Sequence, residues 1–357
     1  EEAGEEFNIN SPKQLGVILF EKLGLKGGKK TKTGYSTAAD VLEKLRTAHP
    51  IVERILHYRQ LAKLKSTYAD GLLAVMDAET EKIYSTFNQT ITATGRISST
   101  EPNLQNIPVR TAEGRQIRSL FVPGPGYDCF ISSDYSQVEL RVLAHMSGDE
   151  SLIRAFRNKE DIHRRTAAEV LGIPFEEVTS EQRSHAKAVN FGIVYGISEF
   201  SLAEDIGVSR YEARAYIDNY LNNYRGVKEY MHKVVADARE IGYTETLYGR
   251  RRYIPELKSS NFNVRSGAER IALNTPIQGT AADLIKLAMI RVENALNEKY
   301  PDAQLLLQVH DELIVECPEG IAQEVAALVS REMENVASLS VPLTAEAKFG
   351  KSWYEAK

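Results

Sequence analysis

The stretch Gln304-Leu-Leu-Leu-Gln-Val-His-Asp-Glu-Leu-Ile-Val-Glu316 decides the fold. Two apolar runs flank His310-Asp311-Glu312, which predicts a pair of antiparallel strands joined by a tight turn. Carboxylates at such a turn lie against apolar strands, where an unpaired charge is costly to bury. We therefore expect a cation to neutralise them, although an aspartate in a turn more often serves the turn itself.

A second carboxylate, Asp134, ends another apolar strand, which we predict over residues 127–133. A helix is predicted directly after it, over residues 138–145. Two carboxylates that share two Mg²⁺ ions form a phosphoryl-transfer centre. The alternative is that Asp134 is only a turn residue or a helix cap. Asp134 and Asp311 together therefore define a candidate metal site.

The segment Arg183-x3-Lys187-x3-Phe191-x3-Tyr195 spaces two cations and two aromatic rings by four residues. On an α-helix this spacing places the four side chains on one slowly drifting face. The cations suit a triphosphate, and the rings suit stacking on a sugar and a base. The alternative is an ordinary helix that packs two aromatic rings and solvates its basic end.

The rest of the chain alternates between helical and mixed segments. The predicted segments are helices over most of 1–90, helices over 151–243 with a break at Gly172-Ile-Pro174, an irregular stretch over 244–257, a long helix from about 263 that is interrupted near Pro276, a helix over 321–336 and a strand over 342–348. This order predicts an α+β fold in which a helical insertion divides a sheet domain.

The composition excludes several classes of protein. The 357 residues carry 44 Lys and Arg against 49 Asp and Glu, a net charge of −5. An evenly basic nucleic-acid coat is therefore excluded, whereas a local basic cleft is not. Cys129 and Cys317 lie in apolar runs, so we expect buried free thiols and no zinc site.

Three further features of the sequence bear on its organisation. No run of about 18 apolar residues occurs, so no membrane span is predicted. The chain opens with Glu1 rather than Met, and we expect it to be a piece of a longer protein. The lysine-rich loop over 26–34 is either a solvated linker or a contact to phosphates.

Several long motifs stand in a recognisable order. They are Thr94-Gly-Arg96-Ile-Ser-Ser, Asn103-Leu-Gln-Asn-Ile-Pro108, Asp134-Tyr-Ser-Gln-Val-Glu-Leu-Arg141, Arg183-x3-Lys187-x3-Phe191-x3-Tyr195-Gly196, Asn274-Thr-Pro-Ile-Gln278-Gly-Thr-Ala-Ala-Asp283 and Gln308-Val-His-Asp-Glu312. Taken together, the chain resembles the polymerase region of the family A DNA polymerases, the bacterial DNA polymerase I group. The similarity runs over nearly the whole chain.

The resemblance implies a right-hand architecture with an antiparallel-sheet palm and largely helical fingers and thumb. Its parts would be a partial thumb over 1–85, palm over 86–145 and 260–357, and fingers over 146–259. It implies a template-directed DNA polymerase that adds dNTPs to a primer 3′-OH by two-metal-ion phosphoryl transfer and releases pyrophosphate, in replication and repair. The family's exonuclease-type domain precedes this region, so we expect no proofreading from this chain.

The resemblance also implies a catalytic and metal-binding set. Asp134 and Asp311 would hold two Mg²⁺ ions, for which Mn²⁺ should substitute. The Tyr135 carbonyl and Glu312 would be further ligands. Lys187 would be the third catalytic residue, binding the triphosphate and protonating the pyrophosphate.

A nucleotide-binding set follows from the same resemblance. It comprises Arg183, His163, Lys187, Phe191, Tyr195, Glu139, Gln137 and Ser136. Glu139 would lie under the sugar and exclude a 2′-OH, which selects dNTPs over rNTPs. Phe191 would disfavour dideoxynucleotides, and Tyr195 would stack at the templating position. Arg183 and His163 would clamp the β and γ phosphates.

The implied partners are primer-template DNA and dNTPs. The DNA-binding set comprises Arg96, Gln278, His310, Asn274, Arg270, Asn103, Gln105, Asn106 and Arg110. Arg96, Gln278 and His310 would reach minor-groove edges and the primer end, checking base-pair shape without reading sequence. We expect a monomer in the bacterial cytosol or nucleoid, with no membrane partner.

Two other functions compete with a polymerase. A two-metal nuclease would use Asp134 and Asp311 but would leave the Arg183–Tyr195 face without a role. A non-catalytic nucleic-acid-binding protein would not need both carboxylates. A family A RNA polymerase is disfavoured by Glu139.

Overall fold

The computed structural model describes residues 1–32, 34–109 and 111–357 of the chain. They divide into two compact units, Glu1–Tyr84 and Ser85–Lys357, and each unit has its own hydrophobic core. The candidate catalytic residues all belong to the second unit.

The first unit is mostly helical, as predicted. Its elements are α1 (Pro12–Gly16), a π-helical continuation (Val17–Lys22), α2 (Ala39–Glu43), α3 (Pro50–Lys63), a second π-helical turn (Leu64–Asp70), α4 (Gly71–Val75), β1 (Lys30–Thr31) and β2 (Gly34–Tyr35). Leu15, Leu19 and Leu42 are completely buried in its core. The lysine-rich loop contributes to the β1–β2 hairpin, and its contact to phosphates stays a prediction.

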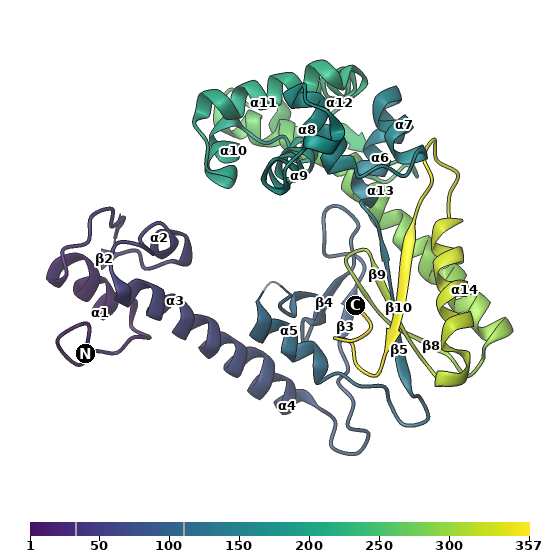
Figure 1. Ribbon diagram of the computed structural model, residues 1–357, viewed down its shortest axis with the longest axis horizontal. Coiled ribbons are helices and arrows are strands. Elements are labelled where there is room, and N and C mark those ends of the chain that lie inside the picture. The colour runs from purple at the N-terminus through teal and green to yellow at the C-terminus, as the bar shows by residue number, and fades with distance from the viewer. Residues whose placement is uncertain (33, 110) are drawn as a thin grey trace. The chain divides into compact units, whose positions relative to one another are not determined.

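The second unit is built on a four-stranded antiparallel sheet in the order β10-β5-β9-β8 (Figure 1). The strands are β5 (Cys129–Tyr135), β8 (Gln304–Val309), β9 (Glu312–Cys317) and β10 (Ala345–Gly350). The two-residue turn at His310-Asp311 joins β8 to β9, which confirms the predicted strand pair. Segments far apart in the sequence therefore meet at the centre of this sheet.

Side-chain alternation gives the sheet one apolar and one polar face. Ile131 and Tyr135 of β5 are buried in the main core, to which α14 (Ala322–Glu334) contributes. Ser132 and Asp134 point to the opposite face and line a cleft. The predicted strand is confirmed, and it continues one residue past Asp134 to Tyr135, since both residues pair with β10 through their backbones.

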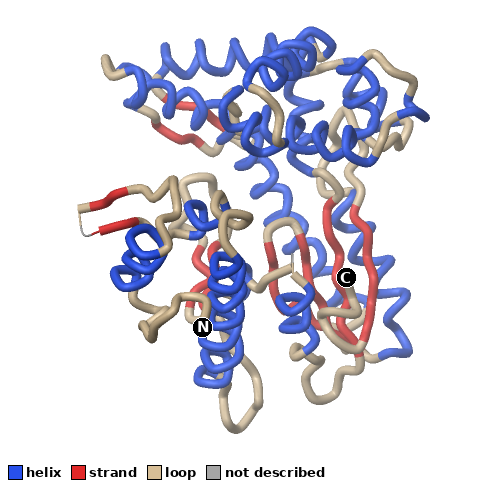
Figure 2. Tube along the Cα trace, turned by 60° about the vertical axis from the view of Figure 1, so that its left-hand side comes forward, coloured by secondary structure: helices blue, strands red, loops and turns tan. Residues whose placement is uncertain are grey.

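A helical insertion separates β5 from β8, as predicted. Its helices are α6 (Val138–Ser147), α7 (Glu150–Arg157), α8 (Ile162–Leu171), α9 (Ser180–Val194), α10 (Glu199–Ile206), α11 (Arg210–Asn223) and α12 (Arg225–Ile241), with a 3-10 turn at Phe175–Glu177. Figure 1 labels these helices, and both Figure 1 and Figure 2 show them gathered in one group. The predicted break is confirmed, since Gly172 ends α8 with a left-handed φ of 66° and Thr179 starts α9 with a capping box.

Two sequence predictions fail after this insertion. Residues 244–257 are not irregular, because β6 (Tyr243–Glu245) and β7 (Arg251–Tyr253) form a hairpin before a 3-10 turn (Pro255–Lys258). The helix α13 (Phe262–Lys299) runs through Pro276 without interruption. Proline removes the N–H that would bond the carbonyl four residues earlier. Here Thr244 Oγ1 donates to that carbonyl, Ala272 O, at 3.4 Å.

The remaining elements are short. They are β3 (Thr86–Asn88), β4 (Ser98–Thr100), a 3-10 turn (Leu104–Asn106), α5 (Ala112–Ser119) and a 3-10 turn (Glu319–Ile321). Cys129 and Cys317 are buried free thiols on adjacent strands, as predicted. Among the described residues, no helix is both long and apolar enough to cross a membrane.

Candidate active site

Two strand ends bring Asp134 and Asp311 together. Asp134 lies near the end of β5, and Asp311 lies in the β8–β9 turn. The backbone N–H of Tyr135 donates to the carbonyl of Asp311 at 3.1 Å, which joins the two ends directly. The turn is tight because His310 adopts a left-handed φ of 58°. The sequence prediction that these two aspartates share one site is consistent with this placement.

The local electrostatics disfavour negative charge on both aspartates. Burial, and next the neighbouring charge of Asp311, raises the pKa of Asp134 to about 7. Burial also raises the pKa of Asp311. The Oδ1 atom of Asp134 is buried and has no hydrogen-bond partner among the described residues. Two repelling carboxylates and an unsatisfied oxygen suit a hard divalent cation.

The described side chains of the candidate site do not supply enough ligands to hold a metal ion by themselves. Within the described parts of the chain, no three His, Cys, Asp or Glu side chains converge as a metal site. Asp134 and Asp311 therefore supply two carboxylates, and further oxygens must come from the backbone, the substrate or water. The carbonyl of Tyr135 is adjacent in the chain to Asp134 and fits that requirement by chemistry.

Glu312 is held by protein donors on both of its oxygens. Its Oε1 accepts from Ser132 Oγ at 2.6 Å and from Trp353 Nε1 at 3.2 Å. Its Oε2 accepts from Lys357 Nζ at 2.6 Å. The side chain is only 2% exposed, and Lys357 is the largest of the influences that keep its pKa below the usual value despite burial. Glu312 thus orients Lys357, whose Nζ also lies 3.7 Å from Asp134 Oδ2.

A buried cation, Arg118, packs beside the Trp353 and Glu312 side chains. Arg118 of α5 lies 4.1 Å from the Trp353 ring centroid and 3.8 Å from Glu312 Oε2. Sequence analysis missed Arg118, Trp353 and Lys357. Each is more than fifteen residues from the aspartates in sequence, so no local spacing could connect it to them.

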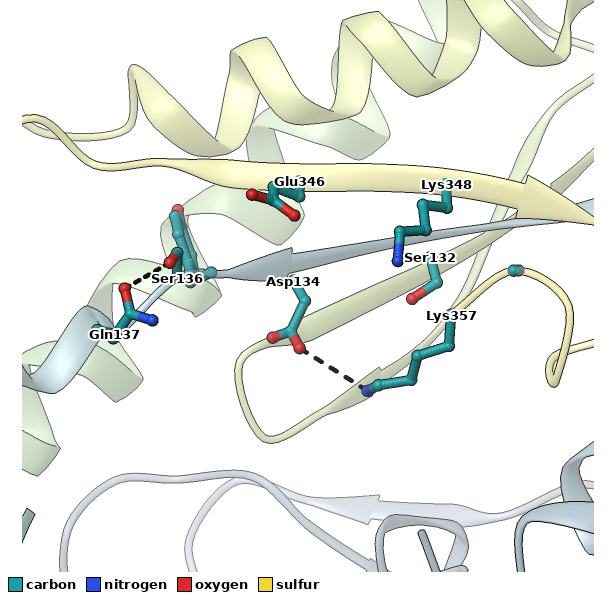
Figure 3. Close-up of a pocket in the computed structure, with 9 residues that line it drawn as sticks. Ser132, Asp134, Ser136, Gln137, Glu346, Lys348 and Lys357 are labelled. Atoms are coloured by element: carbon teal, nitrogen blue, oxygen red, sulfur yellow. Dashed lines mark hydrogen bonds and ion pairs between the residues drawn. The ribbon is translucent and has the colours of Figure 1, made fainter. Parts of the chain in front are cut away.

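The polar face of the sheet opens into a cleft of about 440 Å³ (Figure 3). Its lining residues are Ser132, Asp134, Tyr135, Ser136, Gln137, Glu346, Lys348, Ala356 and Lys357. Ser136 and Gln137, both predicted nucleotide contacts, therefore lie beside Asp134. Ser136 Oγ donates to Gln137 Oε1 at 2.5 Å. Gln137 has a left-handed φ of 46°, which turns the chain sharply from β5 into α6.

Glu139, at the start of α6, accepts hydrogen bonds from a predicted DNA contact, Arg96, and from a predicted nucleotide contact, Tyr195. Its Oε1 accepts from Arg96 Nη2 at 2.6 Å, and its Oε2 accepts from Tyr195 Oη at 2.9 Å. Burial, and next the charge of Glu139, raises the pKa of Tyr195 to about 12, so its hydroxyl stays a donor at neutral pH. Arg96 and Glu139 share a small pocket of about 40 Å³ with His310 and Asp311.

The predicted cationic face lies on α9, with one difference. Arg183, Lys187 and Phe191 belong to the helix, whereas Tyr195 is its non-helical C-cap. The prediction that all four share a helix is wrong at Tyr195, because the chain leaves the helix there and turns at Gly196, where φ is 65°. Arg183 Nε donates to Asp161 Oδ2 at 2.7 Å. Lys187 is exposed, and no ion pair joins it to a described residue.

His163 is buried next to this face. Its ring lies 5.8 Å from that of Phe191 and is 3% exposed. Burial lowers the pKa of His163 to about 4, so the ring is neutral at physiological pH. Asn190 Nδ2 donates to His163 Nδ1 at 3.1 Å, which leaves the ring proton on Nε2.

The predicted DNA contacts fall into two groups. The first group lies near the β8–β9 hairpin and comprises Asn103, Gln105, Asn106 and His310. Gln105 Nε2 donates to Gln308 of β8 at 3.2 Å. Arg270, Asn274 and Gln278 follow one face of α13, since they are spaced by four residues. The Asn274 Oδ1 atom is buried without a partner among the described residues. Arg110 lies outside the described residues.

The antiparallel sheet, divided in sequence by a helical insertion and carrying Asp134 and Asp311 at neighbouring strand ends, has the architecture of a right-hand polymerase. The solved structure of the POL domain of Pol1 from M. smegmatis, in complex with DNA primer-template and dNTP, matches with a TM-score of 0.93. The two chains are 48% identical, and the match covers 99% of this chain and 62% of that one. The chain belongs to DNA polymerase family A, whose family model matches residues 1–355.

Relatives of known sequence agree with this assignment. The chain is 58% identical to DNA polymerase I of Bacillus subtilis (strain 168) and 56% identical to DNA polymerase I of Geobacillus stearothermophilus. Each match covers 99% of this chain and 40% of the relative. The chain therefore spans about two fifths of the length of these relatives.

Proposed function

We propose that this chain is a template-directed DNA polymerase that adds dNTPs to a primer 3′-OH and releases pyrophosphate, in replication and repair synthesis. The observation that carries the proposal is the Asp134–Asp311 pair. Asp134 has a raised pKa and a buried oxygen without a hydrogen-bond partner among the described residues. The chain is also similar, over 99% of its length, to a domain solved with primer-template and dNTP.

The proposed metal site uses Asp134, Asp311 and the carbonyl of Tyr135. Two Mg²⁺ or Mn²⁺ ions held by these oxygens would supply Lewis acidity towards the primer 3′-OH and countercharge for the leaving pyrophosphate. Glu312 contributes by holding Lys357, since both of its oxygens already accept protein hydrogen bonds. Its role in the proposal is to position a neighbouring cation.

The proposed triphosphate clamp lies on α8 and α9. Lys187 has an exposed ammonium that can bind the triphosphate and protonate the departing oxygen. Arg183 exchanges Asp161 for phosphate, and the neutral His163 donates from Nε2. Asn190 fixes that tautomer, so it acts as a positioning residue for His163.

Sugar selection is assigned to Glu139. Its carboxylate is fixed from both sides by Arg96 and Tyr195, so it cannot move away from a ribose 2′-OH without breaking two hydrogen bonds. A fixed obstacle rejects a ribonucleotide more strongly than a mobile one. Phe191 contacts the sugar of the incoming nucleotide and disfavours dideoxynucleotides. Primer-template is contacted by the DNA-binding residues named above, among them Gln278 and His310.

The proposed parts of the hand keep the boundaries expected from the sequence. They are a partial thumb over 1–85, palm over 86–145 and 260–357, and fingers over 146–259. We further propose a monomer acting in the bacterial cytosol or nucleoid, without proofreading by the residues of this chain.

Primer extension tests the proposal. The chain should extend a recessed primer with Mg²⁺ and four dNTPs at low salt, and Asp134→Ala should abolish extension. Asp302→Ala, in the exposed turn before β8, is the matched control and should extend normally. Release of nucleoside monophosphates without dNTPs would indicate a nuclease instead. DNA binding without any Mg²⁺-dependent turnover would indicate a non-catalytic binding protein.

A further inference from the structure

The cleft beside Asp134 lies towards the β10 edge of the sheet, whereas one group of predicted DNA contacts lies at the β8 edge. Gln105 and His310 gather at β8 and the β8–β9 turn. The strand order places β10 at the opposite edge, beyond β5. Glu346 and Lys348 of β10 line the cleft together with Asp134. The cleft therefore extends from Asp134 towards β10, away from Gln105 and His310.

The cleft carries two ammonium groups, that of Lys357, which Glu312 holds, and that of Lys348, to which the proposed function gives no role. Lys348 lies opposite Ser132 in the strand register, and Lys357 Nζ lies 3.7 Å from Asp134 Oδ2. Figure 3 shows both side chains directed towards the opening that holds Asp134. Lys348 is exposed, and no ion pair joins it to a described residue. A phosphate entering the cleft therefore does not have to displace a partner from Lys348.

The cleft also carries carboxylates, which restricts its ligand. Glu346 is the register partner of Asp134, so two negative groups face the same space as two lysines. A bare anion would be repelled by the carboxylates, whereas an anion that carries its own divalent cation satisfies both sets of charges.

The lining offers no aromatic surface for a nucleotide base. Tyr135 is its one aromatic residue, and the Tyr135 hydroxyl donates to Met333 O on the α14 side of the sheet. That ring is therefore turned away from the cleft and offers no surface on which a base can stack. The cleft thus favours a phosphate group without a base.

We propose that this cleft binds the magnesium complex of pyrophosphate as it leaves the reaction site. The inference rests on the proposed function. In that reaction the O3′–Pα bond forms and the bond from Pα to the bridging oxygen breaks. The 3′-OH loses its proton to solvent water, and the leaving pyrophosphate takes the bond's electron pair and a proton from Lys187. Lys348 and Lys357 bind the phosphate oxygens, while Glu346 and Asp134 face the accompanying ion.

Direct binding tests the inference without turnover. Isothermal titration of the whole chain with magnesium pyrophosphate, in the absence of DNA, should give about fivefold weaker binding for Lys348→Met than for the parent. Lys348→Arg keeps the charge and should bind within about twofold of the parent. Lys351→Met is the matched control, because Lys351 lies three residues away and pairs with Glu319 at 2.7 Å outside the cleft. It should bind as the parent does.

Pyrophosphorolysis supplies the second measurement. The pyrophosphate KM of Lys348→Met should rise by the same factor as its dissociation constant. Equal binding by Lys348→Met and the parent would overturn the inference, as would equal weakening in Lys351→Met. A parent that binds magnesium pyrophosphate but does not extend primers would refute the proposed function. A parent that extends primers but binds pyrophosphate independently of Lys348 would refute only the cleft.

Discussion

Replacing Asp134 by asparagine should stabilise the metal-free protein while it removes the proposed activity. The substitution keeps the shape of the side chain and deletes one of two repelling charges. The pKa of Asp134 rises from 3.8 to about 7 on folding, through burial and then through the charge of Asp311. Because the folded-state pKa is the higher one, the retained proton stabilises the fold below about pH 4, and this advantage is lost as pH rises through 7.

The size of the effect follows from that shift. A shift of about three units corresponds to about 4 kcal/mol before screening, at about 1.4 kcal/mol per unit. The Asp134 side chain is 43% exposed, even though its Oδ1 atom is enclosed, so solvent screens part of the cost. We therefore expect Asp134→Asn to gain about 1–2 kcal/mol at pH 8 and less than half of that at pH 5.

The single tryptophan makes this measurable. Trp353 is 2% exposed and donates to Glu312 beside the site, so its fluorescence reports unfolding of the second unit. With EDTA present, Asp134→Asn should raise Tm by about 3–6 °C at pH 8 and by less at pH 5. Asp302→Asn, on the exposed turn, should leave Tm unchanged at both values. An equal gain at pH 5 and pH 8, or no gain at pH 8, would refute the account of the aspartate pair.

Two further substitutions test other parts of the structure. Glu139→Ala removes the carboxylate held by Arg96 and Tyr195, so the ratio of rNTP to dNTP kcat/KM should rise at least about tenfold; an unchanged ratio would contradict the assigned role in sugar selection. Arg250→Ala leaves the buried Asp283 without its ion pair at 2.7 Å and should cost about 2 kcal/mol, a fall in Tm of about 5 °C. Arg251→Ala breaks an exposed pair and should cost less than about 0.5 kcal/mol, and equal losses would contradict this assignment.

Much of the framework could be predicted from local patterns. The β8–β9 pair follows from apolar runs on either side of His310-Asp311, and the α8–α9 break follows from Gly172 and the residues after it. These signals are local because a turn or a helix cap depends on a few neighbouring residues. The assigned functions of individual side chains came instead from the resemblance to family A polymerases.

Interactions between distant segments could not be predicted in this way. Pro276 predicts a helix break by the local rule, yet Thr244 satisfies the carbonyl that the proline leaves free. The hydrogen-bond partners of Glu312 are likewise distant in sequence, since they are Ser132, Trp353 and Lys357. Each outcome depends on a partner that only the folded chain brings near.

Single-nucleotide incorporation tests whether the chain adds nucleotides under the direction of a template and with metal held at Asp134 and Asp311. A primer-template is offered each dNTP in turn, opposite each template base, with Mg²⁺ or with EDTA, using the parent and Asp311→Asn. We expect addition of the complementary nucleotide only, in Mg²⁺ only, with a loss of at least about a hundredfold in Asp311→Asn while DNA binding is retained. Addition that ignores the template base, persists in EDTA, or survives in Asp311→Asn would contradict it.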